Sequence, residues 1–464
     1  MNPRNIARVG GLALTTALLV GVSAPAMAGS FYLQEQSTRG AGRAYSGEGA
    51  DTGVQSLWWN PAAIARSGRQ AYVGAHGLIL DSAVDDRGST INYNLPAPAP
   101  FPAGTILTGS TPVGGNPHVH DVVESGLVPN FAIAQPIGDR FTVGLAVQAP
   151  YNFTTKYEAN DFARYDAMTS ELRSANIGLV LAAKVTDWLD VGAGFDAQYV
   201  KAKLTSAMPN LPTVTGVAGA PTAAGVPVFL LPAATDGFNS LEGDGWDYGW
   251  NVGAQAHFSK LDLGLSYRSK IEHDLDGDIN ISGLTGALAV ANVAANGNAN
   301  FNTPWFATLS GRYHVNDKLT LNAQVNRIGW SEFDAIRVHY NTTDTAIVQN
   351  YKDVTTGAIG FDYAVDPTMT VRGGIGYDPT PTRDGQRTAR IPDADRWLFS
   401  VGGSTEVTEG VTFDAGLTYI AFSDSTIHDD RAFYAGTPAA VTSHLRGEAE
   451  GSALVASIGA RWAF

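Results

Sequence analysis

The strongest constraint on this chain is an alternation of apolar and polar residues with a period of two, which recurs along almost the whole sequence. In WDYGWNVGAQAHF, residues 246–258, aromatic and aliphatic side chains fall on one face of a strand and polar ones on the other. LDVGAGFDAQY, KLTLNAQVN and VTFDAGLTY repeat this split. The runs reach about ten residues, whereas globular strands commonly have about five or six. That length is typical of a tilted strand that crosses a bilayer.

Aromatic residues lie where such strands would meet the lipid headgroups. The chain ends in ASIGARWAF, which alternates up to Phe464 and resembles the closing strand of bacterial outer-membrane barrels. An exported soluble β-protein would alternate as well, but its apolar face would pack inside and its strands would be shorter. We therefore predict a protein of the bacterial outer membrane. Tryptophans at or near predicted strand ends are Trp188, Trp246, Trp305, Trp330, Trp397 and Trp462.

The N-terminus has the pattern of an export signal. Arg4 and Arg8 precede the apolar run LALTTALLVGV and the small-residue end APAMA, so residues 1–28 are predicted to be a signal peptide. No later stretch reaches the roughly 18 apolar residues of a membrane-spanning helix. The chain has no Cys and a formal net charge of −14. These features exclude disulfides and thiolate metal sites and argue against nucleic acid as a partner. We expect no cofactor and no metal.

Short and long connections alternate along the chain, as short periplasmic turns and longer external loops do in a barrel. We therefore predict an all-β fold: a transmembrane antiparallel β-barrel of about 14 strands, formed by residues 70–464, with an N-terminal hatch (plug) inside the lumen. Tight turns are predicted at 136–140, 184–188, 259–262, 315–318, 365–368 and 406–410. Long connections are predicted near 81–120, 158–170, 205–243, 283–302, 341–347, 380–392 and 424–445.

Residues 29–69 are the segment that we predict to be the hatch. They lack a sustained alternation and are rich in Gly and Ser. Glycines would let the backbone approach the wall, and Asn60-Pro61 would make a turn. The hatch motif comprises Gly42, Arg43, Tyr45, Gly47, Glu48, Gly49, Asn60 and Pro61.

Several motifs resemble one family of transporters. GRAYSGEGA, NPAAI, LEGDGWDYGWNVGAQAHFSKLDLGLSYRS and IPDADRWLFSVGG are similar, in this order, to the FadL family of outer-membrane long-chain fatty acid transporters, which includes transporters of aromatic hydrocarbons of the TodX type. The similarity covers essentially the mature chain. It implies a hatch-closed barrel that is not an enzyme and that releases hydrophobic molecules through a lateral opening in its wall. The expected partners are a hydrophobic ligand, outer-membrane lipid and lipopolysaccharide, and we expect a monomer.

Candidate ligand-binding residues come from the resemblance and from the distribution of charge. The resemblance implies that Phe31 is an aromatic finger in the binding pocket. By approximate phase, Lys201 and Lys203 are predicted to point into the lumen or toward the rim, where a basic group suits a carboxylate ligand. Residues of one charged loop could hold a ligand headgroup or gating ion pairs, with ordinary surface pairs as the alternative. These are Asp378, Arg383, Arg387 and Arg390.

The stretch Pro150, Tyr151 and Asn152 is predicted to form a lateral gate. The third strand alternates from Phe141 to Ala149 and then meets a proline, which cannot donate to the neighbouring strand. In hydrocarbon, such an interruption persists only where protein or a cavity covers it. The family has a glycine-centred kink in this strand, so the chain departs from the family pattern here but is predicted to keep the kink.

Two uncharged connections, 205–235 and 283–300, are predicted to capture ligand from outside, with packing over the barrel mouth as the alternative. Where fatty acid transporters carry a basic pocket residue, this chain has Leu204, Thr205 and Ser206. Long-chain fatty acids are the first interpretation of the substrate, and aromatic or alkane hydrocarbons remain open. A general porin and an outer-membrane lipase are more distant alternatives, because the hatch would block an open pore and no Ser–His pair stands out.

Overall fold

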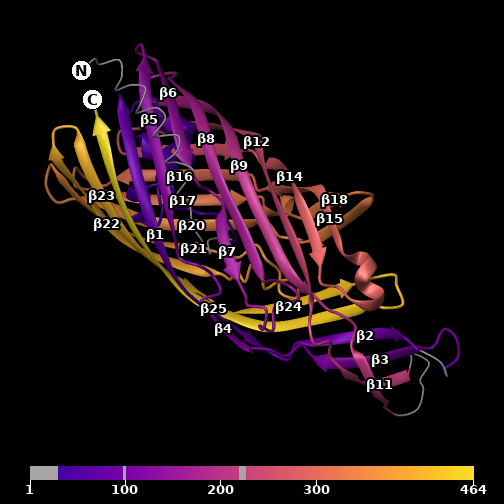
Figure 1. The fold of residues 1–464 in the computed structure, drawn as a ribbon. Coiled ribbons are helices and arrows are strands. Elements are labelled where there is room, and N and C mark those ends of the chain that lie inside the picture. The colour runs from indigo at the N-terminus through magenta and orange to yellow at the C-terminus, as the bar shows by residue number, and fades with distance from the viewer. Residues whose placement is uncertain (1–29, 98–100, 219–225) are drawn as a thin grey trace, which may run out of the picture.

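The wall of the molecule is one closed antiparallel barrel of fourteen strands (Figure 1). This computed structural model describes residues 30–97, 101–218 and 226–464. The predicted signal peptide and Gly29 of the predicted hatch lie outside the described residues. The barrel closes where β1 pairs with β25, from Gln70 opposite Ala463 to Asp86 opposite Gly447. The predicted fold class is therefore confirmed.

Most wall strands run without a break, and others consist of two consecutive segments. The unbroken strands are β1 (Gln70–Asp86), β5 (Gly126–Ile137), β8 (Thr169–Lys184), β9 (Leu189–Met208), β12 (Gly237–His257), β20 (Val354–Ala364), β21 (Met369–Asp378), β22 (Arg396–Thr408) and β25 (Val441–Ala463). The two-segment strands are β6 (Phe141–Gln148) with β7 (Asn152–Lys156), β13 (Leu261–Arg268) with β14 (Ile271–Ser282), β15 (Val293–Thr303) with β16 (Phe306–His314), β17 (Leu319–Ile328) with β18 (Ala335–Tyr340), and β23 (Val411–Phe422) with β24 (Ser425–Phe433).

The apolar face of each strand points out of the barrel. On β12, Trp246, Tyr248 and Trp250 are 49%, 62% and 51% exposed, whereas Asn251 and Gln255 on the opposite face are buried. This is the reverse of a soluble sandwich, because the outward face is solvated by lipid. The alternation read from the sequence is therefore that of a membrane barrel.

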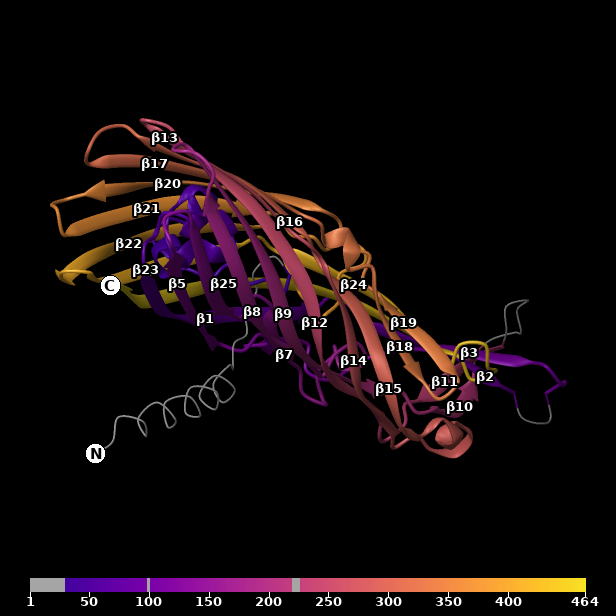
Figure 2. The ribbon, with the colours of Figure 1, turned by 90° about the horizontal axis from the view of Figure 1, so that it is seen from above.

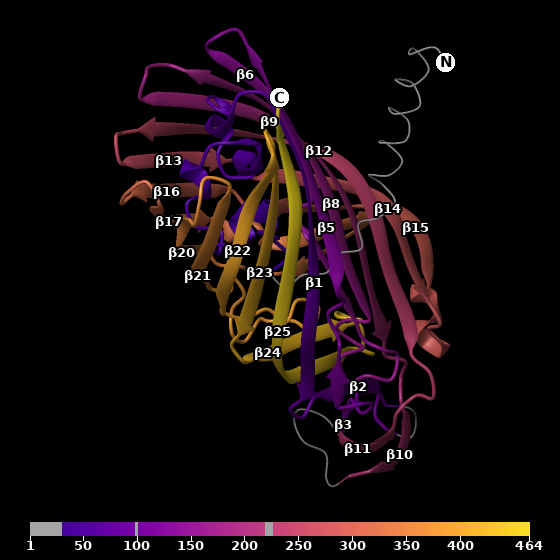
Figure 3. The same ribbon diagram turned by 90° about the vertical axis from the view of Figure 1, so that its left-hand side faces the viewer.

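The six predicted tight turns join consecutive wall strands at one end of the barrel, while the predicted long connections contain more strand than expected. Beyond the membrane both faces of a strand meet water or loops, so the period of two fades although the ladder continues. The extra elements are β2 (Thr90–Pro96), β3 (Ile106–Pro112), β4 (His118–His120), β10 (Thr213–Val217), β11 (Val226–Leu231), β19 (Thr343–Val348), and the 3₁₀ turns η4 (Gly286–Ala291) and η5 (Trp330–Glu332). Figure 3 shows β2, β3, β10 and β11 beyond one end of the barrel, and the C-terminus lies at the other end.

Residues 30–69 lie among the wall strands near the end that carries the tight turns (Figure 2). They form α2 (Thr38–Ala41), η1 (Glu48–Ala50), η2 (Val54–Trp58) and η3 (Pro61–Ile64), and nearly all of them are buried. Asn60 caps η3 instead of forming an isolated turn: its side chain accepts the Ala62 N–H at 2.9 Å, and Pro61 occupies the first helical position.

Candidate functional site

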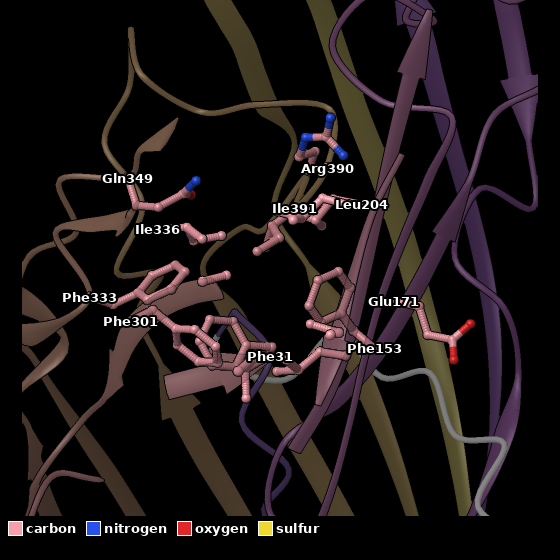
Figure 4. Close-up of a pocket in the computed structure, with 16 residues that line it drawn as sticks. Phe31, Phe153, Glu171, Leu204, Phe301, Phe333, Ile336, Gln349, Arg390 and Ile391 are labelled. Carbon is pink, nitrogen blue, oxygen red and sulfur yellow. The ribbon is translucent and has the colours of Figure 1, made fainter. Parts of the chain in front are cut away.

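An apolar cavity lies in the lumen between the wall and the start of the described chain (Figure 4). The cavity volume is about 50 Å³. The lining is mostly aromatic and aliphatic, which is the character of a site for a hydrophobic ligand. It comprises Phe31, Phe153, Glu171, Leu172, Ala202, Leu204, Leu241, Gly243, Leu275, Ala299, Phe301, Phe333, Ile336, Gln349, Arg390 and Ile391.

Phe31 lies at the floor of this cavity within a cage of aromatic rings. Its ring centroid is 5.8 Å from Tyr151 and 6.0 Å from Phe153 on one side. On the other side it is 4.9 Å from Trp330 and 5.0 Å from Phe333. The side chain is 1% exposed. Several of these contacts are edge-on, the arrangement that aromatic rings favour.

Arg390 supplies the positive charge at the rim of the cavity. Its Nη1 donates to Ser170 Oγ at 3.1 Å and to the Thr205 carbonyl at 3.3 Å. Its Nε is 3.8 Å from Asp166 Oδ1, which is long for an ion pair. Burial lowers the pKa of Arg390 to about 10, so it remains charged at neutral pH. A buried guanidinium with a distant carboxylate is suited to bind an anionic group that enters the cavity.

Other residues of the predicted charged loop bind protein groups outside the cavity. Asp378 pairs with Arg396 and accepts from Gln34 Nε2 at 3.0 Å. Arg387 donates to Thr382 Oγ1, the Thr426 carbonyl and Asp384. Arg383 is exposed and donates to the Asn350 carbonyl. Of the four loop residues predicted from the sequence, Arg390 alone lines the cavity.

Lys201 and Lys203 do not face the lumen, which was one of the two directions predicted for them. They share the outward face of β9 with Phe195, which is 51% exposed. Their Nζ atoms lie 2.8 Å and 3.2 Å from the two carboxylate oxygens of Glu242 on the next strand. Glu171, although it borders the cavity, also turns its carboxylate away from it (Figure 4) and binds Arg173 at 2.8 Å.

The predicted gate residues lie at a break in the wall between β6 and β7. Pairing of β5 with β6 stops at Phe131 opposite Val147, and the next contact on this side is Glu124 N–H to the Thr154 carbonyl at 3.1 Å. Residues 31–33 bond to the broken strand in place of β5. Leu33 N–H donates to the Pro150 carbonyl at 2.7 Å, and Asn152 N–H donates to the Phe31 carbonyl at 3.2 Å.

The Asn152 side chain supplies further hydrogen bonds at this break. Its amide donates to the Ala149 carbonyl at 3.2 Å and accepts the Ser174 N–H at 3.1 Å. In a regular ladder, the neighbouring strand would form hydrogen bonds with these backbone groups. Here residues 31–33 and the Asn152 side chain form them instead, as a low-dielectric environment requires.

A buried network of charged groups joins residues 30–69 to the wall. Arg43 is fully buried and pairs with Glu48 at 2.6 Å, with Asp362 of β20 at 2.8 Å, and with Asp51. Arg312 of β16 reaches both Asp51 and Asp362. The surrounding arginines keep the pKa of Asp51 well below its usual range against the opposing effect of burial.

Wall glycines make room for the same segment. A Cβ on Gly264 would overlap the Gly49 carbonyl oxygen, and a Cβ on Gly374 would overlap that of Arg43. The backbones therefore approach more closely than any side chain would allow. Other wall glycines whose Cβ would meet residues 30–69 are Gly144, Gly192, Gly253, Gly360, Gly376, Gly402, Gly416 and Gly459.

Phe31 and Arg390, which were predicted to bind ligand, line the cavity, and Pro150, which was predicted to form a gate, lies at the break. Phe301, Phe333 and the glycines of the wall were not predicted to belong to this region. Trp330 had been predicted as a headgroup residue at a strand end, whereas it is fully buried. The Gly spacing within the strands could have indicated a close inner neighbour. Among the described residues, no helix has the length and apolarity to cross a membrane. In the same part of the chain, no cluster of three or more His, Cys, Asp or Glu side chains is arranged to hold a metal.

Comparison with known proteins agrees with this geometry. The family model described as outer membrane protein transport protein (OMPP1/FadL/TodX) matches residues 19–464. The chain belongs to this family. The chain is 28% identical to outer membrane protein P1 of Haemophilus influenzae, with 93% of this chain and 95% of the relative covered. It is 29% identical to a long-chain fatty acid transport protein of Escherichia coli O6:H1, with 90% and 92% covered.

Solved structures of the OMPP1/FadL/TodX family share the fold. A Pseudomonas aeruginosa FadL homologue superposes with a TM-score of 0.77 at 22% identity, covering 94% of this chain and all of that chain (100%). The Ralstonia pickettii toluene transporter TbuX gives 0.60 at 20% identity, with 92% and 98% covered. The chain is thus a transport channel of the bacterial outer membrane for hydrophobic compounds, and it is not an enzyme.

Proposed function

We propose that the chain takes up long-chain fatty acids, binds them in the cavity around Phe31, and releases them sideways at Pro150. The observation that carries this proposal is the cavity itself: an apolar space with one buried guanidinium, Arg390, at its rim and the β6–β7 break beside its floor. An alkyl chain gains roughly 25 cal/mol per Å² by leaving water for such a lining. A carboxylate would gain charge-assisted hydrogen bonds from Arg390.

Exposed apolar side chains on the external elements support capture from outside. Phe229 and Leu231 of β11 are 62% and 60% exposed, and Val290 of η4 is 92% exposed. They lie in or next to the uncharged connections predicted to capture ligand. Exposed apolar surface of this kind marks contact with a ligand or a membrane.

The packing of residues 30–69 supports their role as a hatch and favours a lateral exit. Straight passage through the lumen would require the hatch to leave, and this would break the buried Arg43 network and the close contacts at the wall glycines. Removing one partner from a buried ion pair costs about 3–5 kcal/mol. A route through the β6–β7 break leaves those contacts intact.

The surroundings of the barrel are proposed to be lipid and lipopolysaccharide, and the functional unit a monomer. Tyr199 and Trp246 lie opposite each other on the outward face. Two residues further along β9, Lys201 also faces outward and lies opposite Arg173 of β8. Basic groups just beyond an aromatic girdle are placed to meet lipid phosphates. The closed ladder leaves no unpaired wall edge for association.

Mass spectrometry of ligand extracted from the full chain, together with an uptake assay, tests the proposed substrate. Phe31→Glu should abolish oleate uptake, because it places a carboxylate in the aromatic cage. Arg390→Gln should weaken oleate uptake and leave toluene uptake unchanged. Lys201→Gln is the matched control, because it removes an outward-facing cation. Equal effects of Arg390→Gln on both substrates would contradict carboxylate recognition.

Hydrocarbon uptake is the second candidate, because the described lining residues are mostly apolar and include only two charged residues, Arg390 and Glu171, of which Glu171 turns its carboxylate away from the cavity. Toluene uptake that Phe31→Glu abolishes, combined with absence of fatty acid from the extracted ligand, would favour it.

A further inference from the structure

A second break interrupts the wall on the other side of Phe31, where β15 joins β16 and β17 joins β18. On the side of the break toward the tight turns, the last pair is Phe306 with Ile328. On the external side, the last pair is Asn300 with Arg337. Between these pairs, residues 301–305 face residues 329–336 without a regular ladder. The cross-strand contact here is Gly329 N–H to the Trp305 carbonyl at 2.8 Å.

The local chemistry of this break resembles that at Pro150. Pro304 follows the last residue of β15 and, like Pro150, has no N–H to donate to a neighbour. The opposite strand leaves the ladder and forms the turn η5, whose own hydrogen bonds satisfy part of its backbone, such as Phe333 N–H to the Trp330 carbonyl at 2.9 Å. Such a break in a membrane wall must be covered by protein.

Two tryptophans cover the second break, one on each face. Trp305 lies on the outward face, where Trp250, Tyr267 and Trp305 form a row with ring centroids 5.5 Å and 6.0 Å apart. Its indole lies over Gly329, since a Cβ there would overlap the ring. On the inward face Trp330 is fully buried, and its indole N–H has no hydrogen-bond partner among the described residues.

Because this N–H lacks a hydrogen-bond partner among the described residues, keeping Trp330 buried over the break costs free energy. A buried Trp N–H usually finds a hydrogen-bond partner, and leaving one unpaired costs about 1–3 kcal/mol. Just outside the break, Lys270 Nζ joins Glu272 and Glu332 at 2.9 Å and 3.1 Å. These side chains are partly exposed, so this pairing adds little stability.

Phe31 packs against the covers of both breaks. It contacts Tyr151 and Phe153 at the first break and Trp330 and Phe333 at the second. A ligand that displaces Phe31 therefore loosens the inner cover of both breaks together.

We propose that the break between β15–β16 and β17–β18 is a second lateral portal for hydrophobic ligand, closed by Trp305 and Trp330. This inference rests on the proposed release of ligand through the wall. The two portals open from one cavity in different directions, and each is closed by side chains that contact Phe31.

Reversible disulfides test the two portals separately, because the chain has no native Cys. Lock 1 joins Val123→Cys to Thr155→Cys, a bridged pair beside the first break. Lock 2 joins Asn300→Cys to Arg337→Cys, the last pair above the second break. A control lock joins Ile375→Cys to Phe399→Cys on the unbroken ladder of β21 and β22. Antiparallel pairs bring Cα atoms within disulfide range.

Oleate uptake is measured with each oxidised chain in a host that lacks its own transporter, and again after reduction. Two portals predict that lock 1 lowers uptake only in part and that both locks together lower it several-fold further. Full loss with lock 1 and no effect of lock 2 would overturn the second portal and leave lateral release intact. Normal uptake with both locks would overturn lateral release itself.

A second pair of variants tests the cover directly. With lock 1 oxidised, Trp305→Ala should raise the remaining oleate uptake several-fold, and Gly329→Ala should do the same by displacing the indole. Trp250→Ala removes an outward tryptophan of the same row on an unbroken strand and should change nothing. Equal uptake by the Trp305→Ala and Trp250→Ala chains would contradict the portal.

Discussion

At the scale of single residues, burial and the partners of each charge decide which groups can act on a ligand. Arg390 and Arg43 are both buried arginines, but Arg43 is neutralised by close carboxylates whereas Arg390 has Asp166 only at 3.8 Å. The first therefore holds residues 30–69 to the wall, and the second is the group that we propose for binding an incoming anion. Glu35 is another buried acidic residue, and no group in the described part of the chain hydrogen-bonds to its Oε2.

Glu35 gives a pH-dependent prediction. Burial raises its pKa from 4.5 to about 6. A carboxyl with a raised pKa in the folded state binds extra protons there, so its contribution to stability is present below about pH 4.5 and is lost as the pH rises through about 6. At about 1.4 kcal/mol per pKa unit, the loss is roughly 2 kcal/mol.

Glu35→Gln should remove this loss, because the amide does not ionise. The difference in thermal unfolding midpoint between Glu35→Gln and the unchanged chain should grow from about pH 4.5 to about pH 6 and stay level above that. Glu409→Gln, which alters an exposed glutamate in a tight turn, is the control for loss of a carboxylate. A difference that is constant with pH would show that Glu35 does not titrate in the folded chain.

At the scale of elements, glycines of the wall strands allow the backbone of residues 30–69 to pack closely against the wall. Gly264→Ala on β13 should push the Gly49 backbone away from the wall, loosen the hatch and raise ion conductance in planar bilayers. Gly311→Ala on the neighbouring β16 is the matched control, because a Cβ there has its nearest neighbour at 3.5 Å. Equal conductance of the two variants would mean that close packing at Gly264 does not hold the hatch.

The strands could be predicted from the sequence where successive residues face lipid and lumen in regular alternation. On β12, outward residues such as Trp246 and Trp250 alternate with lumen-facing residues such as Asn251, so the strand and its outward face follow from the pattern. Lys201 and Lys203 were predicted to point into the lumen or toward the rim, and they share the outward face of β9 with Phe195. Their phase was read where the pattern weakens, whereas counting from Phe195 gives the outward face. The second break was missed because residues 283–302 were predicted to be a long connection, so Pro304 was not seen to interrupt a strand.

At the scale of the whole molecule, the hatch is proposed to close the lumen while ligand leaves through the wall. Deleting residues 29–69 should leave a heat-stable barrel, because the closed ladder from β1 to β25 does not include them. Ion conductance should rise strongly, since the segment occupies the lumen near the tight turns. Unchanged conductance of the deleted chain would contradict the blocking role.

The most direct test of this account is whether transport requires the hatch to move out. Ala44 and Gly376 allow the hatch to be tied to β21, because a Cβ on Gly376 would lie 3.6 Å from the Ala44 Cβ, within the usual range for a disulfide. The measurement is oleate uptake by the Ala44→Cys, Gly376→Cys chain, oxidised and then reduced. The account predicts the same rate in both states, because ligand leaves sideways with the hatch in place. Loss of uptake on oxidation and its return on reduction would contradict the account and favour passage straight through the lumen.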